Sequence, residues 1–260
     1  MSLIDIKNLS FTYDGGFEPV FDRVSVQLDS NWRLGLIGRN GRGKTTLLRL
    51  LMGEYPFQGS IQTVEHFEYF PFAVENPTQI GWAMAARLYP DLEDWRLKRE
   101  MSCLHLPTEI LDRPFCSLSH GEQTKVMLAI LFAKEQRFLL IDEPTNHLDL
   151  AGRELVGNYL DQKRGFILVS HDRVFLDRCV DHILSINRQN ISLEQGNFTS
   201  WWQNQQRQEQ FERTESEKLK KEVERLTRAS RRTAGWSDQA ERSKYHHDVP
   251  DRGYVGHKSA

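Results

Sequence analysis

The stretch Gly38-Arg39-Asn40-Gly41-Arg42-Gly43-Lys44-Thr45 decides the fold of this chain. It fits the pattern G-x-x-x-x-G-K-[ST], in which glycines let the backbone wrap closely around a polyphosphate. The preceding residues 32–37 (WRLGLI) predict a short buried strand, and residues 45–52 (TTLLRLLM) predict a helix. The stretch is therefore interpreted as a phosphate-binding loop, with Lys44 reaching the β- and γ-phosphates and the Thr45 hydroxyl holding Mg²⁺.

Composition excludes several classes of protein. The chain has 260 residues, of which 39% are hydrophobic and 27% charged, an ordinary soluble composition for one large or two small domains. No apolar run approaches the roughly 18 residues that span a bilayer, and the start, MSLIDIKNLS, lacks a signal-peptide pattern. The three cysteines have no metal-ligand spacing and predict free thiols in a reducing compartment. We therefore expect a cytoplasmic protein without a membrane-spanning segment.

The net charge of −2 conceals a basic carboxy-terminal part, with 12 Lys/Arg against 8 Asp/Glu from Arg213 onward. Residues 201–233 contain no Pro or Gly and predict a long charged helix. It carries three i,i+4 pairs, Glu209/Arg213, Glu217/Lys221 and Glu224/Arg228. Its thin apolar stripe predicts a partner surface, although a solvated charged helix is the alternative.

The residues from Gly235 onward are polar. Their histidines, His246, His247 and His257, are interpreted as ordinary tail residues rather than metal ligands.

Alternating apolar and polar residues at 3–13 and 20–28 predict an antiparallel pair of strands near the start of the chain. Tyr13 ends the first strand, where it could stack on a nucleobase or pack on the sheet, and the residues alone favour packing. Beyond the phosphate loop, residues 59–64 and 66–70 predict strands. Residues 77–100 look helical, as an insertion between two halves of an α/β core.

Ser119-His120-Gly121-Glu122 has the form of a capping box at the start of a helix over 122–134, and locally it could be only a cap. Residues 138–141 (FLLI) predict a buried strand that ends in Asp142-Glu143. Downstream of a phosphate loop, this pattern predicts that Asp142 holds Mg²⁺ through water and that Glu143 polarises the attacking water.

A further buried strand is predicted at 165–170 (GFILVS), and His171 follows it. Ligands bind at the carboxyl ends of strands in open α/β sheets, so His171 is expected to contact the γ-phosphate. Residues 181–187 and 191–193 predict a final hairpin.

Taken in order, these motifs resemble those of ATP-binding cassette ATPases over residues 3–196. The resemblance implies an α/β cassette fold, with an antiparallel β subdomain, a helical subdomain at about 73–134, and hydrolysis of ATP with Mg²⁺. It implies Walker B at Asp142-Glu143, a D-loop at Asp149 and a switch histidine at His171. It implies signature residues that face the ATP of a partner cassette, Ser119, His120, Gly121 and Gln123. Finally, it implies ATP contacts from an adenine-stacking aromatic and the Walker A residues, Tyr13, Gly38, Asn40, Gly41, Arg42, Gly43, Lys44, Thr45 and Thr46.

Residues 143–149 (EPTNHLD) are similar to the ABC-F class, soluble proteins with two cassettes joined by a helical linker. Residues 67–72 (FEYFPF), His120 and Trp201-Trp202 most resemble the lincosamide, streptogramin A and pleuromutilin resistance branch. The resemblance implies a cassette at 1–197 and a truncated linker at 198–260. It implies action on the ribosome, in translation or in antibiotic resistance by ribosome protection. The expected partners are a second cassette, from a missing carboxy-terminal half or a homodimer, and ribosomal RNA or tRNA contacted by Arg225, Arg228, Arg231 and Arg232.

Three departures from the family pattern stand out. Phe72 lies where the family has a glutamine in the Q-loop, His120 replaces a signature glycine, and no second cassette is present. Two alternatives remain open at this point. One is the nucleotide-binding subunit of a membrane transporter, and the other is an ATP-gated clamp whose shape matters more than its turnover.

Overall fold

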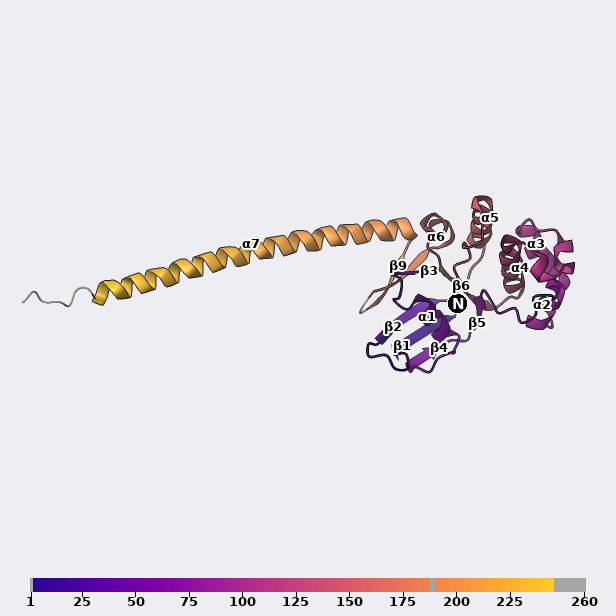
Figure 1. Cartoon of the computed structure of the whole chain (residues 1–260), viewed down its shortest axis with the longest axis horizontal. Coiled ribbons are helices and arrows are strands. Elements are labelled where there is room, and N and C mark those ends of the chain that lie inside the picture. The colour runs from indigo at the N-terminus through magenta and orange to yellow at the C-terminus, as the bar shows by residue number, and fades with distance from the viewer. Residues whose placement is uncertain (1, 188–189, 246–260) are drawn as a thin grey trace, which may run out of the picture. The chain divides into compact units, whose positions relative to one another are not determined.

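A mostly parallel sheet forms the centre of the chain in the computed structural model, which describes residues 2–187 and 190–245, with side chains to residue 228 (Figure 1). Its strands follow the order β5 (His66–Phe70), β6 (Arg137–Asp142), β7 (Phe166–Val169), β3 (Arg33–Gly38), β8 (His182–Ile186) and β9 (Ile191–Gln195). All neighbours are parallel except β8 and β9, which form the predicted hairpin. Four successive residues are buried in each of β3, β6 and β7, as in a sheet covered on both faces.

A second, antiparallel sheet has the order β2 (Phe21–Asp29), β1 (Leu3–Phe11) and β4 (Gln58–Gln62). The predicted pairing of the first two strands is confirmed, and Ile6 lies opposite Val26. Helix α1 (Lys44–Leu51) buries its leucines in an apolar cluster shared with β1 and β3. This packing holds the start of α1 at the carboxyl end of β3.

The helical insertion contains α2 (Gly81–Leu88), α3 (Asp94–Cys103), two short 3₁₀ turns, η1 (Thr108–Asp112) and η2 (Phe115–Ser117), and α4 (His120–Ala133). Figure 1 shows α2, α3 and α4 grouped together. The expectation of one helical stretch over 77–100 is wrong, because Pro90 separates two helices. Tyr89, which precedes Pro90, has φ −137° and ψ 84°, since proline disfavours the helical conformation in the residue before it.

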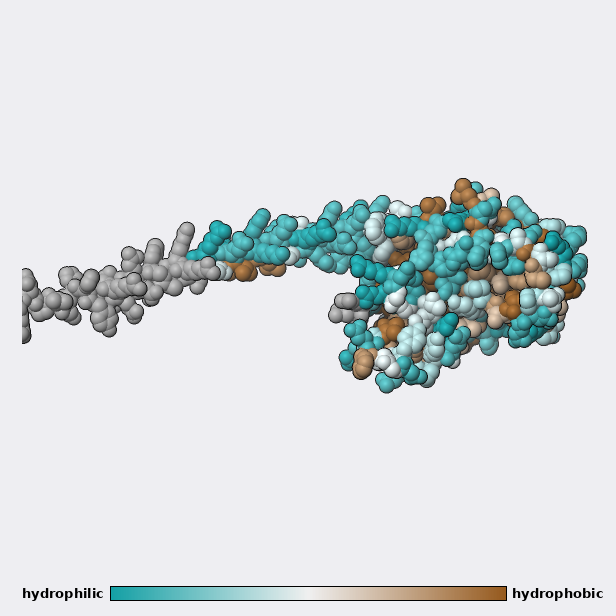
Figure 2. Space-filling model, viewed as in Figure 1, coloured by the Kyte–Doolittle hydropathy of each residue, from teal (hydrophilic) through white to brown (hydrophobic). Residues whose placement is uncertain are grey.

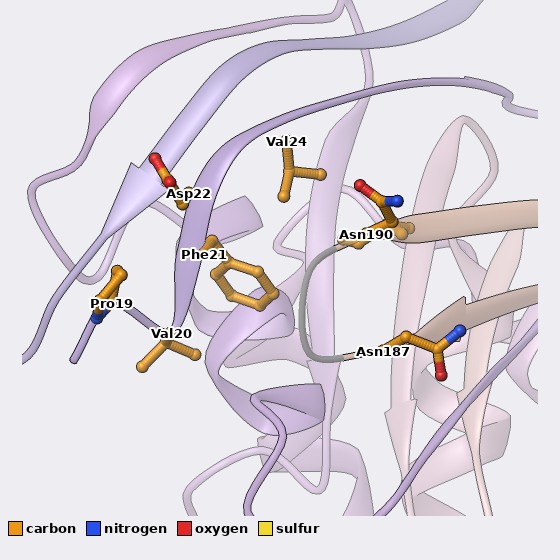
Figure 3. A pocket seen from close by; sticks show the side chains of 8 residues that line it. Pro19, Val20, Phe21, Asp22, Val24, Asn187 and Asn190 are labelled. Atoms are coloured by element: carbon orange, nitrogen blue, oxygen red, sulfur yellow. The ribbon is translucent and has the colours of Figure 1, made fainter. Parts of the chain in front are cut away.

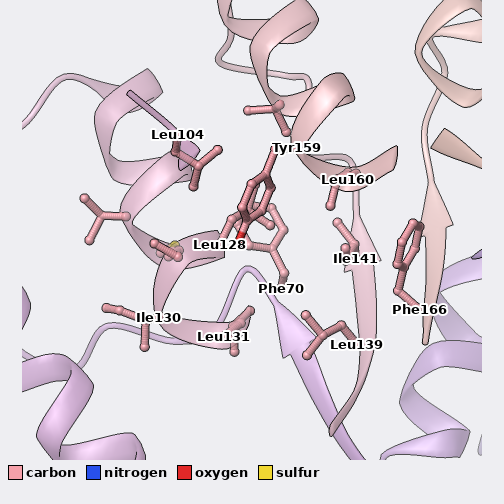
Figure 4. Packing of buried hydrophobic residues seen from close by; sticks show 14 of the residues in the cluster. Phe70, Leu104, Leu128, Ile130, Leu131, Leu139, Ile141, Tyr159, Leu160 and Phe166 are labelled. Atoms are coloured by element: carbon pink, nitrogen blue, oxygen red, sulfur yellow. The ribbon is translucent and has the colours of Figure 1, made fainter. Parts of the chain in front are cut away.

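Helix α4 is buried on nearly all sides, with Val126, Leu128, Ala129 and Ile130 fully covered. Figure 4 shows its leucines and isoleucine against Phe70, Leu139 and Ile141 of the central sheet. A polar contact lies within this packing, where the Tyr159 hydroxyl donates to the buried carboxylate of Glu100 at 2.6 Å. These contacts join the helical insertion to the sheet.

Helices α5 (Leu150–Asp161) and α6 (Arg173–Cys179) follow β6 and β7. Helix α6 was not expected from the sequence. Its start has an ordinary signal, since the Asp172 carboxylate caps the helix by accepting the Phe175 N–H at 3.1 Å.

Helix α7 runs from Phe198 to Tyr245, longer than the expected 201–233. The expectation that the residues from Gly235 form a tail is wrong as far as Tyr245. A single glycine costs a helix only about 1 kcal/mol, and good helix formers lie nearby, at Ala234 and at residues 239–242 (QAER). The histidines assigned to the tail, His246, His247 and His257, lie outside the described residues.

The first turn of α7 packs on α6. Arg173 lies over the rings of Phe198 and Trp202, 5.5 and 5.2 Å from their centroids. Thr199 donates from its N–H and its hydroxyl to Asp177, at 2.7 and 2.5 Å. Consistent with these contacts, the chain divides into two compact units, residues 1–202 and 203–260.

The second unit, described as far as Tyr245, consists of the remainder of α7. Its side chains as far as 228 are mainly hydrophilic (Figure 2), with four exposed apolar residues, Phe211, Leu219, Val223 and Leu226. Of the three predicted i,i+4 pairs, Glu224 and Arg228 lie in contact at 3.8 Å. Among the residues that the structure describes, no helix is both long enough and apolar enough to cross a bilayer.

Candidate functional site

The loop between β3 and α1 takes a conformation that suits glycine. Gly41 and Gly43 have φ of +77° and +94°, in the left-handed region. A Cβ on Gly43 would lie 2.6 Å from Val20 Cγ1, so a side chain has no room there. Gly43 is also the N-cap of α1 and supplies no side-chain cap, which leaves the first-turn N–H groups free of side-chain acceptors. Such N–H groups form a binding site for an anion.

The Lys44 ammonium lies over this loop. Its Nζ donates to the Gly38 carbonyl at 2.9 Å and to Asn40 Oδ1 at 3.3 Å. These contacts hold a positive charge beside the N-terminus of α1, where it adds to the attraction for phosphate.

Thr45, in the first turn of α1, meets Asp142 at the carboxyl end of β6. The Thr45 hydroxyl donates to Asp142 Oδ2 at 2.9 Å, and the Tyr69 hydroxyl donates to the same oxygen at 2.9 Å. A hydroxyl and a carboxylate are the oxygen ligands that Mg²⁺ prefers in proteins. The Thr45 hydroxyl and the Asp142 carboxylate therefore fit a magnesium ion. Burial and the neighbouring Asp142 carboxylate raise the pKa of Tyr69, which keeps its hydroxyl a donor.

Glu143 is strained and largely buried. Its φ is +53°, unusual for a residue with a Cβ, and its N–H donates to the Val169 carbonyl at 2.9 Å. Its side chain is 18% exposed, and Oε1 is buried without a hydrogen bond from any described residue. Burial raises the pKa of the Glu143 carboxyl. A carboxyl with a raised pKa in a pocket suits the role of a proton acceptor.

His171 follows β7 and approaches Glu143. Its N–H donates to Glu143 Oε2 at 3.4 Å, and its Nε2 lies 3.4 Å from Oε1. The imidazole is 64% exposed and lies at the mouth of the site. The adjacent carboxyl ends of β3, β6 and β7 thus bring together the loop, the carboxylates and the histidine.

These residues line one open pocket of about 400 Å³. Its lining comes from the loop, the first turn of α1 and the carboxyl ends of β6 and β7, together with Tyr13 and Val20. Most predicted ATP and metal residues lie here, namely Tyr13, Asn40, Gly41, Gly43, Lys44, Thr45, Thr46, Asp142, Glu143 and His171. Gly38 and Arg42 belong to the same loop but do not line the pocket.

The contacts of Tyr13 bear on both alternatives left open for it, stacking on a nucleobase and packing on the sheet. Its hydroxyl hydrogen-bonds to Thr46 Oγ1 at 2.7 Å, and its ring packs edge-on against Phe11 and Tyr55. It is nevertheless 44% exposed and lines the pocket, so packing orients the ring without covering it.

The signature residues lie apart from this pocket. Ser119 caps α4, and the predicted capping box is confirmed in full, with Glu122 accepting from the Ser119 N–H at 2.8 Å. His120 and Gln123 line a neighbouring hollow with His147, whose ring centroid lies 5.1 Å from that of His120. Asp149 caps α5 by accepting the Gly152 N–H at 2.8 Å.

Another hollow lies between the start of β2 and the β8–β9 turn (Figure 3). It is lined by Phe21, Asp22, Asn187 and Asn190 among others. It holds one carboxylate and no cationic side chain among its described residues, so it does not resemble a phosphate site.

Sequence reasoning missed Tyr69. Nothing in the strand HFEYF marks this tyrosine, because its contact with Asp142 arises only from the parallel pairing of β5 with β6. Phe72, at the expected Q-loop position, packs half-buried against the large apolar cluster instead.

The fold and this pocket together define an ATP-binding cassette domain. A family model described as ABC transporter matches residues 21–146. A solved metal-chelate type ABC transporter in an inward-facing conformation superposes with a TM-score of 0.63 at 25% identity, over 75% of this chain and 84% of that one. A bacterial Atm1-family ABC exporter with ATP bound shares the fold at TM-score 0.65 and 19% identity, over 78% of this chain and 40% of that one. The expected α/β cassette fold is confirmed.

Residues 21–146 thus match an ABC transporter domain, and the curated relatives of the chain include members of ABC transporter family F. It is 31% identical over 243 residues to the ribosome protection protein VmlR of Bacillus subtilis, covering 92% of this chain and 41% of the relative. It is 37% identical to the erythromycin resistance ATP-binding protein MsrA of Staphylococcus epidermidis, covering 69% and 34%. It is 29% identical to ABC transporter F family member 2 of Arabidopsis thaliana, covering 71% and 28%. The chain therefore spans less than half the length of these relatives.

Proposed function

We propose that the chain binds and hydrolyses ATP with Mg²⁺, as one cassette of an ABC-F protein. The observation that carries the proposal is the single pocket lined by the glycine loop, Lys44, Asp142, Glu143 and His171. The loop N–H groups and Lys44 bind the phosphates, and Thr45 and Asp142 hold the metal. Mg²⁺, when bound, neutralises charge on the β- and γ-phosphates.

In the proposed reaction, water attacks the γ-phosphorus and the bond to the bridging oxygen breaks. Glu143 accepts the proton of that water, and its raised pKa favours the uptake. His171 contacts the γ-phosphate side of the pocket. Glu143→Gln keeps the shape of the side chain and removes the base, so ATP binds and hydrolysis stops.

The first test measures ATP affinity by calorimetry. Lys44→Ala removes a charge that makes strong hydrogen bonds to phosphate, each worth about 1.5–3 kcal/mol, so ATP should bind at least about tenfold more weakly. Lys98→Ala, on α3 of the helical insertion, is the matched control and should bind as wild type does. Equal affinity in Lys44→Ala and wild type would remove the assignment.

We further propose that efficient hydrolysis needs a second cassette, whose signature serine completes the site across the phosphate. Loss of one preorganised donor lowers a rate by about 10²–10³. Turnover per chain should therefore rise with protein concentration or on adding a second cassette. Rapid turnover that is independent of concentration would contradict this proposal.

The ribosome is the proposed site of action, supported by the likeness to a ribosome protection protein and an erythromycin resistance protein. Arg225 and Arg228 lie on the exposed surface of α7, and the side chains of Arg231 and Arg232 lie outside the described residues. Arginine binds phosphate through a planar, permanently charged fork. Such contacts release counterions and weaken with salt.

The test is co-sedimentation of the Glu143→Gln chain with ribosomes in ATP at several salt concentrations. Replacing the four arginines by glutamine should reduce binding and flatten the salt dependence. The control replaces Arg213, Lys218, Lys220 and Lys221 by glutamine, which removes the same charge from the same helix. Unchanged binding in the arginine variant would favour a merely solvated helix.

A nucleotide-binding subunit of a membrane transporter is the second candidate, because solved transporters share the fold. Phe72 disfavours it, since the loop at this position usually couples a cassette to its permease.

A further inference from the structure

The position that the cassette pattern gives to a Q-loop glutamine holds no amide in this chain. Phe72 stands at that position, and its ring packs on the apolar cluster that contains α4. A phenyl ring offers no oxygen to a metal ion or to its water. A polar contact in place of that glutamine must come from another residue.

Tyr69, three residues earlier, supplies such a contact. It lies in β5 at the register position opposite Leu140, two residues before Asp142 in β6. Its hydroxyl donates to Asp142 Oδ2 at 2.9 Å. The contact therefore links β5 directly to the carboxylate that the metal would use.

The arrangement around Asp142 is asymmetric. Oδ2 accepts from both Tyr69 and Thr45, each at 2.9 Å, and these donors belong to strand β5 and helix α1. Two donors on one oxygen fix the rotation of the carboxylate and leave the lone pairs of Oδ1 for a metal-bound water. Thr45 is itself a proposed ligand and would turn toward the ion, after which Tyr69 alone would hold the carboxylate.

We propose that Tyr69 is a positioning residue for Mg²⁺-ATP, which orients Asp142 in the absence of a Q-loop glutamine. This inference rests on the proposed function of the pocket. Outer-sphere partners of metal ligands typically contribute about 10–100-fold to metal affinity. A role confined to packing predicts a different result, namely lower stability with no change in the dependence on Mg²⁺.

The experiment uses Tyr69→Phe, which removes only the hydroxyl, in the full chain. ATP binding is titrated with Mg²⁺, and Mn²⁺ bound with ATP is followed by electron paramagnetic resonance. The midpoint for Mg²⁺ should rise about tenfold, with an altered Mn²⁺ spectrum, while ATP affinity in EDTA stays at the wild-type value. Tyr89→Phe, which removes a buried hydroxyl in the helical insertion, is the matched control and should leave the midpoint unchanged.

The outcomes separate the two proposals. If wild type binds no ATP with or without Mg²⁺, the proposed function fails. If wild type binds Mg²⁺-ATP and Tyr69→Phe has the same midpoint and spectrum, only the role of Tyr69 is overturned. Equal weakening with Mg²⁺ and in EDTA also overturns it, because that result reports a distorted pocket rather than a misplaced carboxylate.

Discussion

The amino termini of α1 and α4 both follow a motif associated with phosphate, yet they are built in opposite ways. Helix α1 begins after Gly43, which provides no side-chain cap. Helix α4 begins after Ser119, where Glu122 accepts from both the N–H and the hydroxyl of Ser119 at 2.8 Å. One terminus presents N–H groups free of side-chain acceptors, and the other already carries a carboxylate.

This difference teaches that a helix terminus binds an anion only where its own side chains leave it available. A phosphate can enter the α1 terminus directly. At α4 it meets the negative charge of Glu122, and the Ser119 hydroxyl is already engaged. A phosphate bound at the α4 terminus would therefore have to replace this internal cap, whereas the loop before α1 needs no such exchange.

The largest expected effect is that of a substitution in the glycine loop before α1. Gly43→Ala puts a Cβ 2.6 Å from Val20 at φ +94°, and overpacking of this kind costs about 1–3 kcal/mol in addition to the backbone strain. ATP affinity should fall at least about tenfold, at 1.4 kcal/mol per factor of ten. Thermal unfolding should occur at a lower temperature.

Gly121→Ala at the α4 terminus is the matched control. Its Cβ would lie 3.5 Å from the His147 carbonyl, an ordinary contact, so stability and ATP affinity of the isolated chain should be retained. Equal ATP binding by Gly43→Ala and wild type would mean that the loop is not the binding element.

A smaller effect is expected from a substitution at the start of α4. Glu122→Ala removes one half of the capping box, and loss of a cap costs about 1 kcal/mol. For a unit of about 200 residues this lowers Tm by about 2–4 °C. Glu122→Gln should lose less, because glutamine also completes a capping box. ATP binding at the loop should be unaffected in both variants, and a scanning calorimeter measures the shifts.

The smallest effect concerns pH, where Glu122 and Glu143 should act in opposite directions. Hydrogen bonds from the Ser119 side chain and backbone lower the pKa of Glu122, while burial raises the pKa of Glu143. A group whose pKa is lowered in the fold stabilises the fold at pH values above its unfolded-state pKa, and this stabilisation is lost as pH falls through its folded-state pKa. A group whose pKa is raised in the fold destabilises the fold at pH values above its folded-state pKa, and this destabilisation disappears as pH falls below its unfolded-state pKa.

The test is the free energy of unfolding of wild type, Glu122→Gln and Glu143→Gln, measured with denaturant across pH 3–8. At neutral pH Glu122→Gln should be less stable than wild type, and Glu143→Gln should be more stable. The Glu122 difference should shrink as pH falls below an ordinary glutamate pKa of about 4.3, whereas the Glu143 difference should shrink as pH falls toward that value and be gone below it. Parallel pH dependence in the two variants would contradict the opposite environments of the carboxylates.

The site could be predicted where its residues are close in sequence or end a buried strand. The loop before Lys44 and the Asp142-Glu143 pair are of this kind, since local pattern and sheet topology suffice to place them together. The role of Tyr69 could not be predicted, because it depends on which strand β5 pairs with. Ser119 was expected to face a phosphate, but only the structure establishes that Glu122 engages its hydroxyl.

The helices and strands also divide into those that local sequence patterns predicted and those that they did not. The strands of both sheets were predicted within a few residues, because apolar alternation and apolar runs determine them. Two helical boundaries were wrong, at Pro90 and Gly235, and for opposite reasons. Proline removes a donor and restricts the residue before it, whereas an isolated glycine only weakens a helix that its neighbours favour.

The packing of Phe198, Trp201 and Trp202 has a practical consequence for where the chain can be cut. A protein ending at Asn197 would lose the rings beneath Arg173 and the hydroxyl that Thr199 donates to Asp177. Side chains of this kind bury about 150–250 Å² each, so the shortened protein would expose apolar surface over α6 and tend to aggregate. A protein ending at Trp202 keeps that cover, and its last residues form part of the cassette's own surface.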